Sequence, residues 1–330
     1  MPSTACYTQW RRMALTATCA AALSCLLQSV AAAYPDRPVT LVVPFAPAGP
    51  TDIIARVLAN VLSKQLGQQF VVENRAGAAG NTAMGQVARA TPDGYTLMVT
   101  STAVAVNPAL FKKLPYDPFK DFAPISELVN APNVLVVRAD SDIKTIADLV
   151  AQAKATGAKF SYSSPGVGTK SHLTGELLKL RAGIDMVHVP YRGAGPAAQA
   201  VLEKTVQVGS VALAAAESLI QSGQLRALAV TSEKRWFSLP NVPTMIEAGH
   251  KDFVSDTFTA FFAPARVPQD VLTLLAKESR AAFQRPDVRK LSRKAGFEVV
   301  AGTPDQLTAR IKAEIPAVRE LVAKAGIPLR

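Results

Sequence analysis

The sequence predicts an α/β protein with two lobes, each built on a parallel sheet that helices cover. Short β-branched runs such as 39–45 alternate with segments whose apolar residues have helical spacing, such as 52–66. This alternation is typical of parallel sheets. The pattern restarts near residue 134, and the chain is longer than a typical single domain. We therefore expect two successive α/β lobes, with the end of the chain returning to the first lobe.

The expected elements of the first lobe begin with the β-branched strand at 39–45. The following helix carries Ile54, Leu58 and Leu62 at helical spacing, and Gly67 is suited to its C-terminus. A Thr-Pro-Asp-Gly turn at 91–94 separates the last two elements. The others are a strand over 69–73, a helix from the loop 74–81 to about 90, and a strand over 95–100.

The second set of elements repeats the strand–loop–helix order. Thr145 is a plausible N-cap for its first helix, with Asp148 in the first turn. From Pro268 onward the chain is expected to be helix-rich, with one strand near 297–300. The expected strands are 134–137, 160–163, 186–189, 206–212 and 225–231, and the helices are 145–156, 170–181 and 197–202.

The first 33 residues have the pattern of a secretory signal. Arg11 and Arg12 form a positive n-region, residues 13–32 carry no charge, and Ala31-Ala32-Ala33 is a small-residue cleavage site. A transmembrane anchor is the alternative, but the stretch is rich in Thr, Ser and Ala and ends in a cleavage site. We therefore expect cleavage after Ala33 and export to the periplasm.

The composition excludes several classes of protein. All three cysteines (Cys6, Cys19 and Cys25) lie in the signal, so the mature chain has no thiol nucleophile and no Cys-ligated metal. Loss of the two signal arginines lowers the net charge from +11 to +9. The basic residues are scattered and aromatic residues are few, so no nucleic-acid partner is expected. The scattered positive charge is more consistent with a diffuse field that attracts small anions.

Four loops at expected strand ends consist mostly of small residues: 46–51, 74–81, 164–169 and 190–196. In open parallel sheets, ligands bind at the carboxyl ends of strands, where loops lead into helices. Small residues let the backbone approach a ligand, and the N–H groups at helix starts favour anions. Tight connections alone would also use Gly and Pro, but several such loops in two lobes favour a cleft that binds an anion.

Signatures of enzymes and metal sites are lacking. There is no G-x-S-x-G elbow and no H-E-x-x-H motif, so no catalytic residue, metal or cofactor is expected. His172 follows the hydroxyl-rich third loop and could contact a ligand or cap a helix, whereas His188 lies in a strand and is expected to be structural. Asp52 is expected to stabilise a helix start, and Glu73 to pair with Arg75 or the backbone.

Longer motifs give a resemblance to a known family. The segment Val42-Val43-Pro44-Phe45-Ala46-Pro47-Ala48-Gly49-Pro50-Thr51-Asp52 resembles the opening of the tripartite tricarboxylate transporter substrate-binding proteins, also called the Bug family. Residues 71–81 and 189–196 are similar to later motifs of these proteins. The likeness continues through 92–97, 107–108, 121–124, 225–231 and 239–244, so it covers the mature chain in order.

The resemblance implies a periplasmic-binding-protein fold, of the type II-like Venus-flytrap kind. It has two parallel-sheet-rich lobes and two crossovers, expected near 130–133 and 253–262. The first lobe is expected over 34–131 and 256–330, and the second over 132–255. The family's role implies a monomeric receptor without a cofactor, which captures a small carboxylate and delivers it to integral-membrane transporter subunits.

The resemblance also implies which loops hold the ligand, largely through backbone groups and hydroxyls. We call residues 45–52 the first-lobe clamp and residues 163–172 the second-lobe clamp. Because the ligand would contact both lobes, binding would favour the closed state. The expected ligand-binding residues are Phe45, Ala46, Pro47, Ala48, Gly49, Thr51, Asp52, Ser101, Thr102, Ser163, Ser164, Gly166, Gly168, Thr169, His172, Tyr191, Arg192 and Gly193.

The chain departs from the family's pattern at several positions. Ala48, Ala76 and Ala79 stand where the family usually has Gly, Pro and Gly. In the stretch 203–212, Gln207 and Val211 stand where the family has two acidic residues. If Val211 faced the cleft, the pocket would lose a polar contact. The candidate partners for additional ligand charge are Lys170 and Arg192.

Two other functions remain open from the sequence. A receptor that reports ligand status to a signalling system would have the same fold. An exported hydrolase would need a nucleophile and a base within reach of each other, and no Ser/His/acid arrangement is evident. The ligand is not identified either: di- and tricarboxylates, acidic amino acids and aromatic carboxylates all fit.

Overall fold

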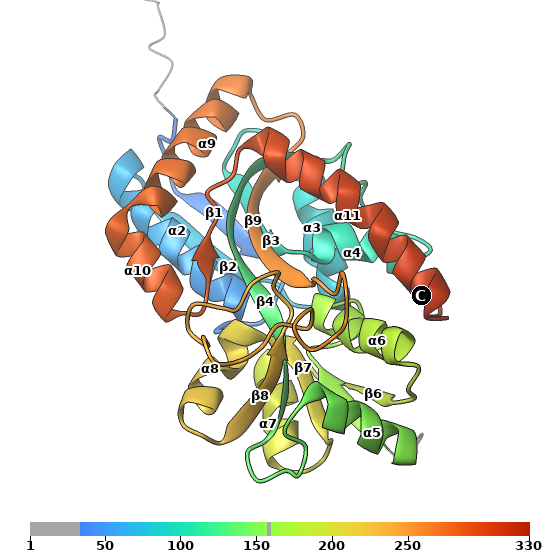
Figure 1. Ribbon diagram of the computed structural model, residues 1–330. Coiled ribbons are helices and arrows are strands. Elements are labelled where there is room, and N and C mark those ends of the chain that lie inside the picture. Colours follow the sequence, from blue (N-terminus) through green and yellow to red (C-terminus); the bar gives the residue numbers. More distant parts are fainter. Residues whose placement is uncertain (1–33, 157–159) are drawn as a thin grey trace, which may run out of the picture. The chain divides into compact units, whose positions relative to one another are not determined.

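Two mixed sheets share one long strand. The computed structural model describes residues 34–156 and 160–330, and residues 37–330 form one compact unit. Strand β4, Phe122–Arg138, pairs with β9, Asp256–Pro264, as far as Pro132. From Asn133 onward it pairs with strands of the second sheet (Figure 1). One strand therefore belongs to both lobes.

The first sheet has the strand order β2-β1-β3-β9-β4, and β10 pairs with β4. Its first three strands are parallel to one another, whereas β9 and β10 run antiparallel to their neighbours. The strands not yet located are β1 (Val39–Val43), β2 (Phe70–Asn74), β3 (Thr96–Ser101) and β10 (Glu298–Val299).

The second sheet continues from β4 in the order β4-β7-β5-β6, and β8 also pairs with β4. Strands β5, β6 and β7 are parallel, while β4 is antiparallel to both β7 and β8. The new strands are β5 (Ser161–Ser164), β6 (Val187–Pro190), β7 (Val208–Ala212) and β8 (Leu225–Val230).

Helices cover both sheets. Those of the first lobe are α2 (Pro50–Leu66), α3 (Asn81–Ala88), α4 (Ala103–Leu110), α9 (Gln269–Gln284), α10 (Pro286–Lys294), α11 (Pro304–Lys324) and the 3₁₀ turn η1 (Ala78–Gly80). Those of the second lobe are α5 (Ile146–Thr156), α6 (Lys170–Ala182), α7 (Ala194–Leu202) and α8 (Leu213–Gln221). None of the helices within the described ranges is long and apolar enough to cross a membrane.

Helix ends follow the local signals in the sequence. Gly67 ends α2 in the left-handed conformation, with φ of 72°, which costs glycine little. Thr145 caps α5, because its Oγ1 accepts a hydrogen bond from Asp148 N at 3.1 Å. Both were predicted. Helix α11 begins with a reciprocal capping box between Thr303 and Gln306.

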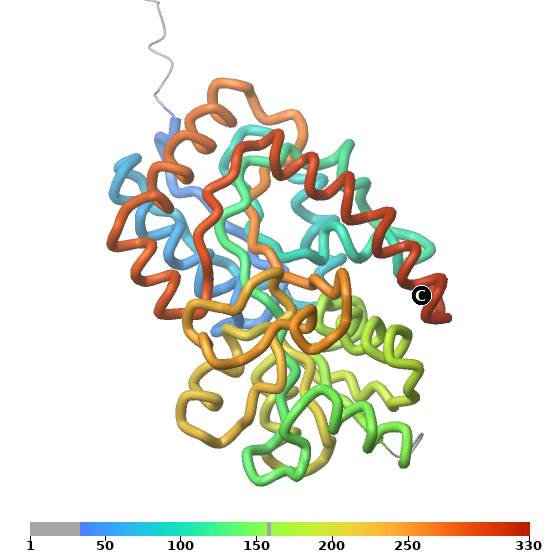
Figure 2. The backbone as a smooth tube through the Cα atoms, in the orientation of Figure 1, coloured from blue at the N-terminus to red at the C-terminus, as the bar shows by residue number. Residues whose placement is uncertain are grey.

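The chain passes between the sheets a second time at Ser255 and Asp256, beside β4. Figure 2 shows the segment near residue 130 and the segment near residue 256 running together, and Pro132 pairs with Asp256. Asn133 Nδ2 donates to Ser255 O at 3.0 Å, and Thr231 Oγ1 donates to Asn133 O at 3.0 Å. These buried polar groups satisfy backbone groups where the strands change sheet.

The secondary structure corrects the sequence analysis in several places. The predicted parallel sheets contain antiparallel strands, because β4 and β9 run between the lobes and β8 lies beside β4. Helices α4 and α8 and the first part of β4 were not predicted. The proposed signal, residues 1–33, lies outside the described residues, so cleavage after Ala33 stays a prediction.

Candidate ligand-binding site

The two small-residue loops of the first lobe adjoin one another. Asn74 Nδ2 donates to Phe45 O at 3.1 Å, which joins the end of β2 to the loop after β1. A Cβ atom added to Gly80 would lie 3.0 Å from the Cβ of Pro44. The loops 44–49 and 74–80 therefore form one surface at the carboxyl ends of parallel strands, as predicted.

The two small-residue loops of the second lobe also adjoin. Tyr191 N donates to Ser164 O at 2.9 Å, and Gly193 N donates to Pro165 O at 3.1 Å. A Cβ atom on Gly166, whose φ is 134°, would lie 3.2 Å from Tyr191 O. Tyr191 and Gly193 thus lie directly beside the second-lobe clamp, while Arg192 between them is exposed.

Gly168 brings the loops of the two lobes together. A Cβ atom added to this buried residue would lie 3.5 Å from Asn107 Oδ1 and from Leu110 Cδ1, and 3.8 Å from Ala79 Cβ. All three neighbours belong to the first lobe. Because its φ is 89°, Gly168 holds a conformation that L side chains rarely adopt. The four predicted loops therefore form a continuous series: 46–51 adjoins 74–81, 74–81 adjoins 164–169, and 164–169 adjoins 190–196.

Asp52 organises the first-lobe clamp. Its Oδ2 accepts hydrogen bonds from Ala48 N at 2.9 Å and from Arg56 Nε at 2.8 Å, and its Oδ1 accepts from Asn74 Nδ2 at 2.9 Å. Burial opposes ionisation, but these hydrogen bonds outweigh it and lower the pKa of Asp52. The predicted place at a helix start is confirmed. Its carboxylate also fixes the loop beside it.

The other residues of the first-lobe clamp differ in exposure. Ala46, Pro47 and Ala48 are exposed, Phe45 and Gly49 are half-buried, and Thr51 is buried. Ser101 ends β3, and its Oγ accepts a hydrogen bond from Ala103 N at 3.4 Å; Thr102 is buried at the start of α4. These residues lie at the same sheet edge as the clamp, because β1 and β3 are parallel neighbours.

Two of the alanines that depart from the family's pattern have left-handed backbone. The φ angle is 61° at Ala48 and 55° at Ala79. Left-handed backbone is about 1–2 kcal/mol less favourable for an L-residue than the right-handed form. This explains why glycine suits both positions. The hydrogen bonds around Asp52 and Asn107 hold these two loops in place.

The hydroxyl groups of the second-lobe clamp are bonded within their own lobe. Ser163 Oγ donates to Ala197 O at 2.7 Å, and Thr169 Oγ1 donates to Gly166 O at 2.7 Å. Ser164 Oγ lies 2.6 Å from His188 Nε2 and accepts from Gly166 N at 3.2 Å. The loop therefore has a fixed internal conformation, and Thr169 also caps α6.

Two stacked histidines lie behind this clamp. The ring centroids of His172 and His188 are 4.2 Å apart, and Tyr162 stacks on His188 at 4.9 Å. Burial lowers the pKa of His172 to about 4 and, together with nearby positive charge, that of His188 to about 3. His172 is buried, and Gly168 N donates to its Nδ1 at 3.5 Å. His172 thus supports the loop from behind. His188, which was predicted to be structural, contacts Ser164 of the same loop.

The two candidate partners for extra ligand charge differ. Lys170 Nζ lies 2.5 Å from Glu314 Oε1, and only 15% of its side chain is exposed. Arg192 is exposed, with no ion pair to any residue in the described ranges. Val211 is fully buried in an apolar cluster with Ala197 and Leu213, so the hypothesis that it faces the cleft is wrong.

Sequence reasoning missed a buried amide network behind the first-lobe loops. Asn107 Nδ2 donates to Ala79 O at 3.0 Å and to Asn81 Oδ1 at 2.6 Å, and Tyr116 OH donates to Asn81 Oδ1 at 2.9 Å. Asn107 Oδ1 is a buried acceptor without a donor among the described residues. Asn81 and Asn107 both lie in motifs that carry the family resemblance, which was the available signal.

Two hollows lie outside the first-lobe and second-lobe clamps, although the smaller one borders Ala78 and Asn81 of the loop 74–81. One of about 730 Å³ is formed by the start of β4, α9 and the start of α11, and one of about 420 Å³ borders α3 and Phe111. Neither is lined by a predicted ligand-binding residue. Within 34–156 and 160–330, no group of three or more His, Cys, Asp or Glu side chains could hold a metal ion.

Comparisons with known proteins extend over almost the whole chain. A family model described as the tripartite tricarboxylate transporter family receptor matches residues 54–327. The solved structure of the periplasmic binding protein BugD is 36% identical, with a TM-score of 0.84, over 90% of this chain and 100% of that one. The likeness confirms the periplasmic-binding-protein fold expected from the sequence.

Two further solved structures are similar and contain ligands. Rpa4515 of R. palustris, solved with adipate, is 33% identical, with a TM-score of 0.86 over 90% of this chain and 100% of that one. MatC of Rhodopseudomonas palustris, solved with bound malate, is 32% identical, with a TM-score of 0.82 over 88% and 100%.

Proposed function

Because this chain belongs to the tripartite tricarboxylate transporter family of receptors, we propose that it captures a small carboxylate between its first-lobe and second-lobe clamps. The loaded receptor then delivers the ligand to integral-membrane transporter subunits. The observation that carries this proposal is the succession of contacts that joins the four predicted loops, with Gly168 against Ala79 and Asn107 as the link between lobes.

The chemistry of both clamps suits an anion. The first-lobe clamp leads into α2 and the second-lobe clamp into α6, and the start of a helix favours negative charge. Residues 46–48 are exposed and therefore accessible to a ligand. The 18 residues expected to bind ligand, Phe45 to Gly193, remain the proposed site, with Asp52, Ser163, Ser164 and His172 in supporting positions.

A dicarboxylate is the proposed class of ligand. Two relatives were solved with adipate and with malate, and each of these molecules carries two carboxylates. In this chain one carboxylate would meet the clamps, and the exposed Arg192 guanidinium would meet the second. Arg192 suits that role better than Lys170, because the Lys170 cation already pairs with Glu314.

The same proposal includes the cellular setting. The receptor acts in the periplasm as a monomer after cleavage at Ala33, without catalytic activity. Its first lobe comprises 34–131 and 256–330 and its second lobe 132–255. The two strands that pass between the sheets near these boundaries support this division. The mass of the protein purified from the periplasm would locate the cleavage site.

Thermal unfolding tests the ligand proposal. The exported protein is unfolded with adipate, malate, citrate, glutamate and benzoate, each beside a matched amine or sugar. A ligand at one hundred times its dissociation constant adds about 2.7 kcal/mol of stability, which raises the unfolding midpoint measurably. A raised midpoint with dicarboxylates is the expected result. A response to amines or sugars and to no carboxylate would overturn the proposal.

A further inference from the structure

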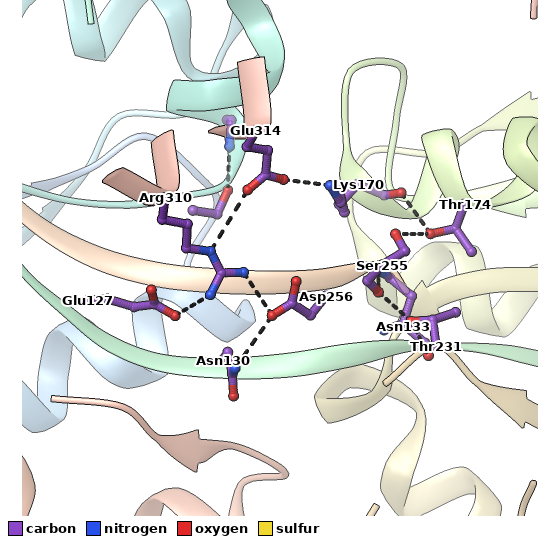
Figure 3. A network of polar contacts seen from close by, with 12 residues as sticks. Glu127, Asn130, Asn133, Lys170, Thr174, Thr231, Ser255, Asp256, Arg310 and Glu314 are labelled. Carbon is purple, nitrogen blue, oxygen red and sulfur yellow. Dashed lines mark hydrogen bonds and ion pairs between the residues drawn. The ribbon is translucent and has the colours of Figure 1, made fainter. Parts of the chain in front are cut away.

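A group of charged residues joins the second-lobe clamp to α11 and to both strands that pass between the lobes (Figure 3). Arg310 is at its centre. Its Nη1 lies 2.5 Å from Glu127 Oε1 on β4, and its Nη2 lies 2.7 Å from Asp256 Oδ2 on β9. One turn along α11, Glu314 Oε1 lies 2.5 Å from Lys170 Nζ, at the start of α6.

This group is substantially buried and contains more carboxyl groups than cations. The side chains of Lys170 and Glu314 are 15% and 10% exposed. Three carboxylates (Glu127, Asp256 and Glu314) face two cations. Burial raises the pKa of Glu127 to about 7, against the effect of Arg310. Each cation therefore has carboxylate partners, and Lys170 is held by Glu314.

Further contacts fix the first turns of α6 beside the ion pair. Ser171 Oγ donates to Asn133 Oδ1 at 2.6 Å, and Thr174 Oγ1 lies 2.7 Å from Ser255 Oγ. Leu173 packs in a buried cluster with residues of α4 and α11, including Leu110 and Val318. Helix α6 therefore contacts both crossing segments and the first lobe within its first two turns.

We propose that the Lys170–Glu314 ion pair is a positioning device for the second-lobe clamp: it holds the start of α6 against α11 and thereby favours the closed arrangement in which ligand is bound. Neither residue touches the ligand. The pair acts through the clamp, because Lys170 directly follows Thr169 and Gly168. Its effect on affinity rests on the proposed function, but its effect on the clamp does not.

The test uses single and double substitutions with a matched control on the same helix. Lys170→Met and Glu314→Gln each remove one partner, and the double variant removes both. Glu314→Gln leaves the buried Lys170 cation without its carboxylate partner, and Lys170→Met leaves Glu314 with Arg310 alone, at 3.8 Å. Loss of both Lys170 and Glu314 charges restores much of the stability. The control is Glu320→Gln, because Glu320 forms an exposed pair with Lys324 at 2.6 Å. Lys170→Arg keeps the cation and should preserve the positioning.

Two measurements separate this inference from the proposed function. The first is hydrogen exchange of the clamp amides, 163–173, without ligand. We expect the clamp amides to exchange about tenfold faster in both single variants and in the double variant. The core amides of β1 and β3 should exchange faster in the single variants, which lose stability, and more slowly again in the double variant, which recovers much of it. Lys170→Arg and Glu320→Gln should match the wild type. This measurement is decisive even if no carboxylate binds.

The second measurement is the dissociation constant for adipate, or for malate if adipate does not bind. We expect about tenfold weaker binding in all three variants, including the double variant, since fewer molecules occupy the closed state. Unchanged clamp exchange in both single variants would overturn the inference. Tighter binding in Glu314→Gln alone would also overturn it, because Lys170 would then contact the ligand directly. If neither acid binds the wild type, the proposed dicarboxylate class is wrong and clamp exchange alone decides.

Discussion

The two clamps are built differently, although each is a loop that joins a parallel strand to a helix. The first-lobe clamp has three exposed residues, 46–48, and is fixed by one charged group of its own lobe, Asp52. The second-lobe clamp is largely buried, with the His172–His188 stack behind it and Glu314 of the first lobe at its end. The first clamp is therefore a fixed surface. The second is coupled to the position of the lobes.

This difference assigns separate roles to ligand contact and closure. Changes in the first-lobe clamp should alter ligand contact and leave the lobes in place. Changes behind the second-lobe clamp should alter the loop, the crossing strands and closure together, since Ser171 and Thr174 contact Asn133 and Ser255. Substitutions in the two regions can test this distinction directly.

Acid should produce the largest effect, and it should act on the second-lobe clamp. The pKa values of His172 and His188, about 4 and about 3, lie below the ordinary value of 6.5. Their contribution to stability is therefore complete above pH 6.5 and is lost as the pH falls towards 4. For His172 alone the loss approaches about 3 kcal/mol. Glu127, whose pKa is raised to about 7, gains stability over the same range, so the loss is measured as the difference in urea unfolding between the wild type and His172→Gln from pH 7 to pH 4.

The histidine assignment has a direct control. His188→Gln should make the unfolding free energy less dependent on pH over that range, whereas His250→Gln, far from the clamp in sequence, should keep most of the dependence. An equal pH dependence in wild type and His188→Gln would show that the stack does not control acid stability.

A methyl group at Gly175 should disturb the second-lobe clamp nearly as much. An added Cβ atom would lie 2.2 Å from Tyr162 Cε2, inside the contact between α6 and β5. We expect Gly175→Ala to lower the free energy of unfolding by about 3 kcal/mol, since the buried ring must move. Gly195→Ala is the control, because open space surrounds Gly195. Equal stability of the two variants would contradict the packing described here.

Loss of the Asp52 carboxylate should loosen the first-lobe clamp alone. Asp52→Ala removes the acceptor of three hydrogen bonds, so we expect a loss of about 2 kcal/mol. Hydrogen exchange should rise in 45–52 and stay unchanged in 163–172. Asp305→Ala, at an exposed position in the first turn of α11, is the matched control. Faster exchange in both clamps would show that they are not independent.

Glycine at Ala48 should have the smallest effect. The left-handed backbone there, with φ of 61°, is disfavoured for alanine, and glycine relieves it at some cost in unfolded-state entropy. We expect Ala48→Gly to raise the free energy of unfolding by about 0.5 kcal/mol, measured by urea unfolding. Ala46→Gly, without positive φ, should lower it.

The sequence predicted elements with regular periodicity and missed those with mixed signals. Helix α4 is apolar on nearly all sides and contains Pro108, so its helical period was hidden. Strand β4 contains Pro124 and Pro132, which argue against a central strand. The pairing with β9 shifts register beside Pro124, and Pro132 marks the passage to the second sheet.

In the candidate site, too, local features could be predicted and contacts between distant residues could not. The loops could be predicted because strand ends and small residues are local signals. The partners of Asp52 could not, since Asn74 lies 22 residues away. The Lys170–Glu314 pair, 144 residues apart, depends on how α11 returns to the first lobe. Lys170 therefore resembled a ligand partner in the sequence but is an ion-pair partner in the fold.

In the proposed complex, one carboxylate contacts both clamps. Hydrogen exchange of the exported protein, with and without the dicarboxylate that raises the unfolding midpoint most, tests it directly. We expect slower exchange in both 45–52 and 163–172 at the same ligand concentration, with little change in the turn at 91–94. Slower exchange in only one clamp, or in neither, would contradict it.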